Sequence, residues 1–175
     1  ATSALTPALA ADYVIDTKGA HASINFEASH LGYSVLAGRF NTFSGNFSYD
    51  KANIAASKIS VTIDTSSFDS NHAKRDKHVR SDDFLDVNKF AQATFISTKV
   101  TDQGNGKLAI NGNFTLHGVT KPMTIDAVKV GEGSDPWGGY RLGFSGTATI
   151  SMADFGFKQD YGQVDLELHI EGIRQ

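Results

Sequence analysis

Apolar and polar residues alternate along most of the chain with a period of two. In the segment 22–29, ASINFEAS, every second residue from Ala22 to Ala28 is apolar and the residues between them are polar. Side chains of a β-strand point alternately to opposite faces, so this pattern predicts a strand with one buried face. The sequence therefore predicts a meander of short strands. The same alternation recurs in the segments 43–49, 59–63, 108–116, 123–127, 144–150 and 164–170.

Turn-forming and helix-forming residues occupy the segments between these strands. The segment 102–107, DQGNGK, contains an Asn-Gly pair that suits a tight hairpin, and the segment 131–139, GEGSDPWGG, predicts a longer loop. We interpret Trp137 in this loop as part of a turn that caps one end of the fold, with contact to a membrane as the alternative. The segment 70–81 predicts a helix because it lacks glycine and proline, and Asn71 is a candidate N-cap.

About eight strands and one short helix indicate an all-β fold, either a flat sandwich or an up-and-down barrel. Small residues on the apolar faces favour the barrel. Gly45, Gly112, Gly146 and Gly172 continue the apolar alternation of their strands. A sandwich core needs volume at such positions because voids lower stability, whereas a barrel of about eight strands can hold a ligand there. The alternative is that these glycines only mark bends and bulges.

The alternation also predicts which side chains line the interior of such a barrel. The inward positions carry hardly any charge, so we expect an apolar ligand. Strands of about ten residues tilted by about 40° give a depth of roughly 25 Å, which suits an extended lipid tail. The predicted lining residues are Phe26, Ala28, Phe43, Phe47, Ile63, Phe95, Ile110, Phe114, Phe144, Ala148 and Leu166.

The composition excludes several other classes of protein. A length of 175 residues with 40% hydrophobic residues corresponds to one domain with a sizeable core. Nineteen acidic and sixteen basic residues give a net charge of -3, which provides no electrostatic footprint for a nucleic acid. The absence of cysteine excludes disulfides, thiol nucleophiles and thiolate metal sites.

The first residues differ in character from the rest of the chain. Residues 1–10 are mostly small and apolar, and Ala8, Leu9 and Ala10 match the small-x-small pattern that precedes a secretory cleavage site. We expect the tail of a signal peptide here, or alternatively a disordered N-terminus, followed by a single domain over residues 11–175. No apolar run reaches the roughly 18 residues needed to span a bilayer, so stable membrane insertion is not expected.

Charged residues concentrate in the segment 70–84, SNHAKRDKHVRSDDF. His72 and His78 would point roughly 240° apart around a helix, which disfavours a shared metal ion. A generic Ser, His and Asp without a nucleophile elbow is weak support for hydrolysis, so we predict no catalytic and no metal-binding residues. The segment is interpreted as a helix that plugs or covers the barrel. In the alternative, functional interpretation, Arg75, His78 or Arg80 binds the polar head group of the ligand at the pore mouth.

Six segments of the chain carry motifs that occur together in one family. They are ADYVID (11–16), HLGYSVLAGRF (30–40), NHAKRDKHVRSDDFL (71–85), QATF (92–95), LHGVTKPMT (116–124) and DPWGG (135–139). In this order and spacing they resemble the YceI-like family of bacterial periplasmic lipid-binding proteins. The resemblance implies a lipocalin-like antiparallel β-barrel whose pore binds a polyisoprenoid, such as an isoprenoid quinone, or another amphiphile. It also implies a periplasmic location, a link to quinone metabolism or transport and to stress responses, and neither catalysis nor a cofactor.

Three functional hypotheses follow. The first is an exported carrier that holds a polyisoprenoid or related lipid in an apolar pore. The second is an enzyme that acts on a bound quinone or lipid, which requires an acid, a base or a metal in the lumen. The third is a structural or interaction protein with a filled core, expected if the inward glycines lie beside bulky neighbours. A closed barrel has no free sheet edge, so we expect a monomer or a weak homodimer.

Overall fold

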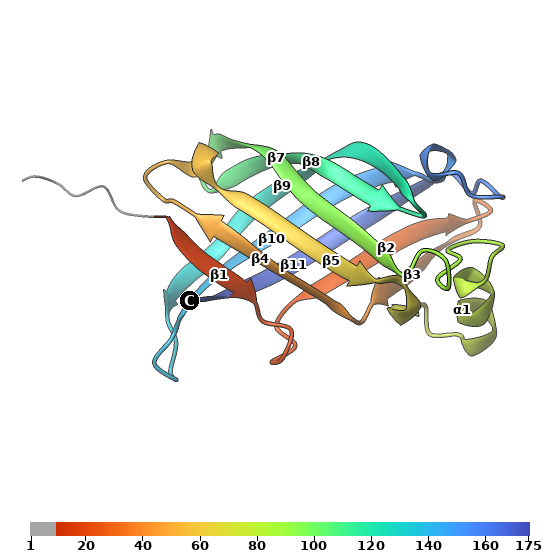
Figure 1. The fold of residues 1–175 in the computed structure, drawn as a ribbon, viewed down its shortest axis with the longest axis horizontal. Coiled ribbons are helices and arrows are strands. Elements are labelled where there is room, and N and C mark those ends of the chain that lie inside the picture. Colours follow the sequence, from red (N-terminus) through yellow and green to blue (C-terminus); the bar gives the residue numbers. More distant parts are fainter. Residues whose placement is uncertain (1–9) are drawn as a thin grey trace, which may run out of the picture.

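Antiparallel β-strands form most of the protein and close into a barrel (Figure 1). The computed structural model describes residues 10–175, so the predicted signal-peptide tail, apart from Ala10, lies outside the described residues. The strands are β1 (Ala11–Ile15), β2 (Ser23–His30), β3 (Ser34–Phe40), β4 (Phe43–Tyr49), β5 (Lys58–Asp64), β6 (Phe68–Asp69), β7 (Gln92–Gly104), β8 (Lys107–Leu116), β9 (Val119–Ser134), β10 (Tyr140–Ser151) and β11 (Gln163–Arg174). The helical elements of the described part are α1 (Ala73–Arg80) and the short 3-10 helices η1 (Ile54–Ala56), η2 (Thr65–Ser67) and η3 (Met152–Phe155).

The sheet closes because β1 pairs with β4 along one edge and with β11 along the other. β1 and β2 lie end to end beside β11, since β1 pairs with residues 172–174 and β2 with residues 164–169. On their other side, β4 pairs with β1 and β3 pairs with β2. These two interrupted strands, together with β5 and β7 to β11, make an eight-stranded antiparallel barrel. The predicted up-and-down barrel is confirmed, and the flat sandwich is excluded.

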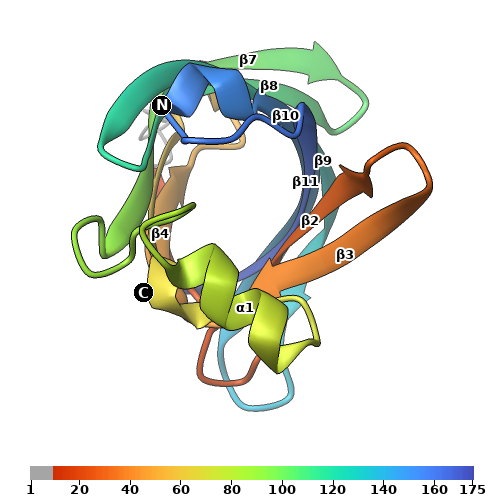
Figure 2. The same ribbon diagram turned by 90° about the vertical axis from the view of Figure 1, so that its right-hand side faces the viewer.

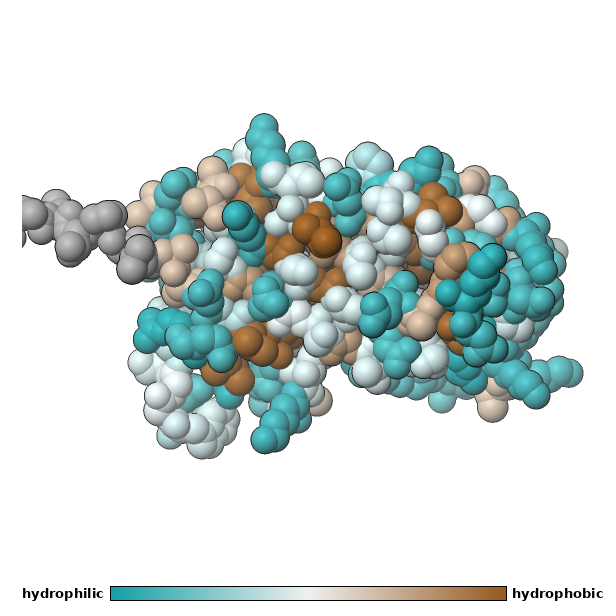
Figure 3. Space-filling model, viewed as in Figure 1, coloured by the Kyte–Doolittle hydropathy of each residue, from teal (hydrophilic) through white to brown (hydrophobic). Residues whose placement is uncertain are grey.

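The predicted strand segments all lie in strands, and one predicted loop is shorter than expected. Residues 131–134 continue β9, so the turn to β10 is confined to residues 135–139. Asn105 and Gly106, between β7 and β8, have φ angles of +55° and +77°, as the tight Asn-Gly hairpin requires. Four further strands, β1, β3, β6 and β7, were not among the predicted segments. Hydrophilic and intermediate residues cover most of the outer face in Figure 3, and hydrophobic residues there form small separate patches.

Three of the four inward glycines leave no empty space beside them, and the fourth, Gly146, borders a small cavity. An added Cβ would lie 2.4 Å from the Phe95 ring at Gly112 and 2.5 Å from the Phe47 ring at Gly172. The other two glycines are covered by isoleucine side chains that reach within 2.8 Å of such an atom. The prediction that these positions open the lumen is therefore wrong at Gly45, Gly112 and Gly172, because large side chains from other strands occupy the space beside them.

Helix α1 lies across part of one end of the barrel (Figure 2). It is shorter than the predicted segment 70–81, and its N-cap is His72 rather than Asn71. The His72 Nδ1 accepts a hydrogen bond of 3.1 Å from the Arg75 N–H, whereas Asn71 has a φ of +64° and precedes the cap. α1 has eight residues, and no helix among residues 10–175 has the length and apolar character that a bilayer-spanning helix requires.

Candidate ligand-binding cavity

A cavity of about 470 Å³ lies at the end of the barrel that α1 borders. This volume is within the usual range of small-molecule sites, about 300–1,000 Å³. Its lining is mostly apolar and comes from the strands, from α1 and from the turns around it. We call it the larger cavity.

The structure divides the predicted lining residues among three places. The larger cavity is lined by Phe26, Ala28, Ile63, Phe114 and Leu166. A second, smaller cavity is lined by Phe47, Ile110 and Phe144. Neither cavity is lined by Phe43, Phe95 or Ala148. The period-two pattern tells which face of the sheet a side chain occupies but not its level along the barrel axis, so it could not separate these groups.

Turns at the helix end add lining residues that the sequence pattern did not identify. Leu31 lies in the turn between β2 and β3, Phe84 follows α1, and Phe157 and Tyr161 follow η3. No period-two pattern marks these residues because they lie outside regular strands. Their aromatic character is a sequence signal for Phe84, Phe157 and Tyr161, whereas Leu31 carries no such signal.

Arg75 is held at the wall of the larger cavity by Ser70 and Asp76. The Arg75 Nε donates to the Ser70 Oγ, and its Nη2 donates to the Ser70 backbone carbonyl, both at 2.7 Å. The Ser70 Oγ in turn donates to the buried Asp76 carboxylate at 2.5 Å. Within residues 10–175, the second terminal nitrogen of Arg75, Nη1, has no hydrogen-bond partner. One edge of a fixed guanidinium is thus available to an acceptor in the cavity.

The other two predicted head-group residues differ from each other in position. His78 lines the larger cavity, its Nε2 lies 3.0 Å from the Asp83 Oδ2, and its ring packs edge-on against Phe84. Arg80 does not line the cavity, because its Nη1 donates to the backbone carbonyl of Phe68 at 3.1 Å. Arg80 is therefore not part of the cavity lining, and its contact with a head group stays a prediction.

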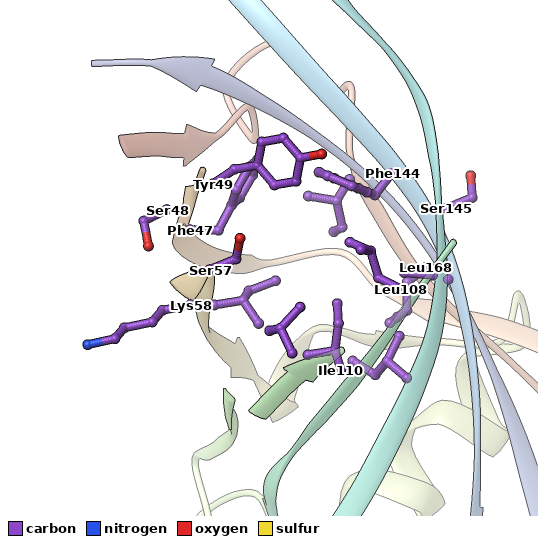
Figure 4. Close-up of a pocket in the computed structure, with 16 residues that line it drawn as sticks. Phe47, Ser48, Tyr49, Ser57, Lys58, Leu108, Ile110, Phe144, Ser145 and Leu168 are labelled. Atoms are coloured by element: carbon purple, nitrogen blue, oxygen red, sulfur yellow. The ribbon is translucent and has the colours of Figure 1, made fainter. Parts of the chain in front are cut away.

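The smaller cavity, of about 60 Å³, lies in the half of the barrel away from α1. Figure 4 shows Phe47, Tyr49 and Phe144 along one side of it, and the side chains of Lys58 and Ser145 turned away from it. Its lining is apolar except for a few polar groups such as the Ser57 hydroxyl. The Ser57 Oγ is buried and has no hydrogen-bond partner in the described part of the chain. A water molecule needs at least two polar partners, so this cavity suits an apolar group better than water.

A layer of side chains separates the two cavities. Along β5, Ile59 lines the smaller cavity, Ile63 lines the larger one, and Val61 between them lines neither. β8 shows the same order, with Gly112 at the intermediate position. Phe95 is paired with Val61, and its ring covers Gly112. The interior therefore holds two cavities with no lining residue in common, and Phe95, Val61 and Gly112 lie at a level between them.

A cluster of ionisable side chains lies where β1 ends. The Arg141 Nη1 lies 2.6 Å from the Asp16 Oδ2 and 3.0 Å from the Glu171 Oε2. The His21 Nδ1 lies 2.8 Å from the same Asp16 oxygen, so donor atoms of three potential metal ligands come within 4.8 Å of one another. The Arg141 guanidinium already supplies positive charge between the carboxylates, which makes this a salt-bridge network. Hydrogen bonds from His21, Arg141 and the Gly19 N–H lower the pKa of Asp16 to about 2.

Comparison with known sequences identifies relatives of almost the whole chain. The profile of the YceI-like domain matches residues 13–172. A UPF0312 protein of Vibrio parahaemolyticus is 64% identical over 170 residues, which cover 96% of this chain and 90% of that protein. A UPF0312 protein of Shewanella baltica is 64% identical over 172 residues, with 96% and 90% covered.

Solved structures share the barrel. BcnA of Burkholderia cenocepacia aligns with a TM-score of 0.80 at 22% identity, covering 90% of this chain and 98% of that one. The YceI protein of Campylobacter jejuni aligns with a TM-score of 0.76 at 28% identity, covering 84% and 90%. A domain of Saccharophagus degradans, described as polyisoprenoid-binding and implicated in plant cell wall breakdown, aligns with a TM-score of 0.68 at 14% identity, covering 93% and 98%. At 22% and 14% identity, similarity establishes the fold alone.

Proposed function

The chain belongs to the family of YceI-like domains, and on this premise we propose that it is a carrier that holds an amphiphilic, isoprenoid-like lipid in the larger cavity. The observation that carries the proposal is an apolar space of about 470 Å³ inside a closed barrel, bordered by one fixed arginine. Each methylene buried there contributes about 0.8 kcal/mol, so a lipid tail binds with few polar contacts. The polyisoprenoid-binding description of the Saccharophagus degradans domain supports the same ligand class.

The polar groups of the larger cavity set the orientation of the proposed ligand. Its ionisable lining residues are His30, Arg75, His78 and Tyr161, all at the helix end. A quinone carbonyl or another acceptor placed there receives a hydrogen bond from the free edge of Arg75, while the tail lies among the phenylalanines deeper in the barrel. This arrangement supports binding of a head group more than chemistry on the tail, and so favours a carrier over an enzyme.

The proposed carrier acts after export to the periplasm. The small-x-small pattern at Ala8 to Ala10 supports this location. A lipid that crosses the periplasm between two membranes has to keep its apolar tail out of water. The internal cavity of a closed barrel provides that shielding.

Organic extraction of the purified protein, followed by mass spectrometry, tests the proposed function. We expect an amphiphile with an isoprenoid-like tail at a substantial fraction of one molecule per chain. The extraction should be repeated on protein from the native host and from a heterologous host, because the available lipids differ. If no lipid is recovered from either preparation, and none binds when it is added to the purified chain, the carrier function is wrong.

Removing the Phe95 ring is expected to change the preferred tail length. In Phe95→Ala the two cavities join, so a long polyprenol gains apolar contacts that a short one does not use. Native mass spectrometry with equimolar short and long polyprenols should show a shift of about tenfold or more toward the long chain. Leu142→Ala is the matched control, because Leu142 is fully buried and lines neither cavity. An unchanged ratio in Phe95→Ala, or the same shift in the control, contradicts a partition at Phe95.

A further inference from the structure

The β2–β3 hairpin projects beyond the barrel wall at the end that holds α1 and the larger cavity, and its turn lies to one side of α1 (Figure 2). Its turn uses Leu31 and Gly32, whose φ angles are +54° and +80°. An added Cβ on Gly32 would meet nothing within 4 Å, so the turn is surrounded by open space. Leucine is unfavourable in this turn for two reasons. A residue with a Cβ rarely adopts the left-handed region, and an apolar side chain is exposed to water there. Strain retained at such a position is a signal of function.

Three large apolar side chains of this hairpin face solvent. The exposed fractions are 64% for Leu31, 85% for Tyr33 and 64% for Val35. We call these three residues the hairpin tip. The whole segment 28–38 contains no Asp, Glu, Lys or Arg. Apolar clusters that face water in this way mark sites of contact with another apolar surface.

The hairpin tip is continuous with the wall of the larger cavity. Leu31 belongs both to the tip and to the lining, and its neighbours His30 and Leu36 are lining residues as well. Tyr161 also lines the cavity and is 45% exposed. A lipid tail that leaves along this wall stays in contact with apolar side chains as far as the tip. The phase that receives the tail there has to be apolar too.

Positive charge lies at the same end of the molecule. Lys74 and Lys77 on α1 are exposed, and neither forms an ion pair within residues 10–175. Three of the nearby acids have partners of their own, since Asp76 accepts hydrogen bonds from Ser70, and Asp82 and Asp83 each lie against a basic side chain. The two lysines are therefore available to an anionic surface.

We propose that the hairpin tip and α1 together dock on the surface of an anionic lipid bilayer, with Leu31 and Tyr33 in the interface and Lys74 and Lys77 against the head groups. Apolar side chains next to lysines are the combination by which peripheral proteins bind anionic membranes, and tyrosine favours the interfacial region. A protruding tip offers little area to a protein partner, whereas a bilayer admits it directly. The inference rests on the proposed function, because docking brings the cavity mouth to the phase in which a lipid ligand dissolves.

Co-sedimentation with vesicles tests the docking surface. The full chain is mixed with vesicles of phosphatidylethanolamine and phosphatidylglycerol and, separately, with vesicles of phosphatidylcholine. We expect it to bind the anionic vesicles more tightly. The affinity of the double variant Leu31→Ser/Tyr33→Ser for the anionic vesicles should be lower by a factor of about ten or more. The double variant Lys74→Gln/Lys77→Gln should lose the preference for anionic vesicles and most of the salt dependence.

The matched control is Val128→Ser/Val130→Ser, which removes apolar side chains that are 41% and 72% exposed on β9. It is expected to bind vesicles like the unaltered chain. No binding by the unaltered chain, or an equal loss in the control, overturns the docking surface. A different result would also overturn it. The unaltered chain would bind no vesicles and would run as a dimer in size-exclusion chromatography, and the Leu31→Ser/Tyr33→Ser variant would run as a monomer. In that case the hairpin tip joins two copies of the chain.

Lipid extraction from the same preparations separates this inference from the proposed function. Equal amounts of lipid in the unaltered chain and in Leu31→Ser/Tyr33→Ser, with vesicle binding lost only in the variant, support the docking surface. Vesicle binding by a chain that yields no extractable lipid and binds none when it is added also supports the docking surface but contradicts the carrier function. Extractable lipid without vesicle binding contradicts the docking surface alone.

Discussion

Replacing Ala28 with tryptophan is expected to remove lipid binding from a barrel that still folds. Ala28 lines the larger cavity, and an indole there fills space that the proposed ligand needs. Displacing about four buried methylenes at about 0.8 kcal/mol each weakens binding by on the order of a hundredfold. Titration of the delipidated protein with a fluorescent lipid measures the change, and circular dichroism shows whether the barrel is intact.

Ala37→Trp is the matched control for this experiment. Ala37 is exposed on β3, the strand next to β2, and it pairs with Glu27 of β2 on the outer face of the sheet. The same increase in size outside the barrel should leave lipid affinity within about twofold of the original. Unchanged affinity in Ala28→Trp, or an equal loss in Ala37→Trp, would place the ligand outside the larger cavity.

Arg141→Met is expected to cause a large loss of stability. The guanidinium of Arg141 joins Asp16, Asp135 and Glu171 at 2.6, 2.9 and 3.0 Å, and the side chains of Asp16 and Asp135 are only 5% and 6% exposed. Without the arginine, buried negative charges are left near one another with no compensating cation. We expect the melting temperature to fall by about 10 °C, measured by calorimetry at neutral pH.

The acid dependence of stability gives a second measure of the same network. The pKa of Asp16 is about 2 in the folded protein, below the ordinary value of 3.8, so folding favours the ionised carboxylate. Its stabilising effect is present above about pH 4 and is lost as the pH falls toward 2. In Arg141→Met the pKa of Asp16 rises toward its ordinary value. The difference in melting temperature between the two proteins should therefore be largest at neutral pH and shrink between about pH 4 and pH 2.

Lys158→Met serves as the control for Arg141→Met. Lys158 lies 4.0 Å from Asp82, and both side chains are mostly exposed, at 62% and 76%. Exposed pairs of this kind contribute little, so a change of no more than about 2 °C is expected. A comparable loss in both variants would show that Arg141 has no special role.

The hairpins were predictable because their causes are local, whereas closure of the barrel depends on the pairing of β1 with β11 from the two ends of the chain. The alternation of Leu108, Ile110 and Phe114 follows from the pleat of a single strand, and Asn105 with Gly106 forms a turn from its own backbone preferences. Helix α1 was predictable in position for the same reason. Its cap was not, because both Asn71 and His72 can accept a hydrogen bond and only the folded backbone selects His72.

The salt-bridge network and the division of the interior were not predictable from local patterns. Arg141 and Asp16 are 125 positions apart, and nothing in either segment indicates the other. Phe95 and Gly112 face each other only through the pairing of β7 with β8, so a small residue in the pattern did not mean empty space. Phe43 and Ala148 point inward as expected, yet neither lines a cavity.

The sequence by itself determined that about eight strands each present one apolar face with hardly any charge on it. Alternation is a property of neighbouring residues, and the pleat of the backbone converts it directly into an inside and an outside. Only the tertiary structure decided where that interior is empty. A space remains or disappears according to the summed volumes of side chains from strands far apart in the chain, and at Phe95 and Gly112 one large ring fills what a glycine leaves open.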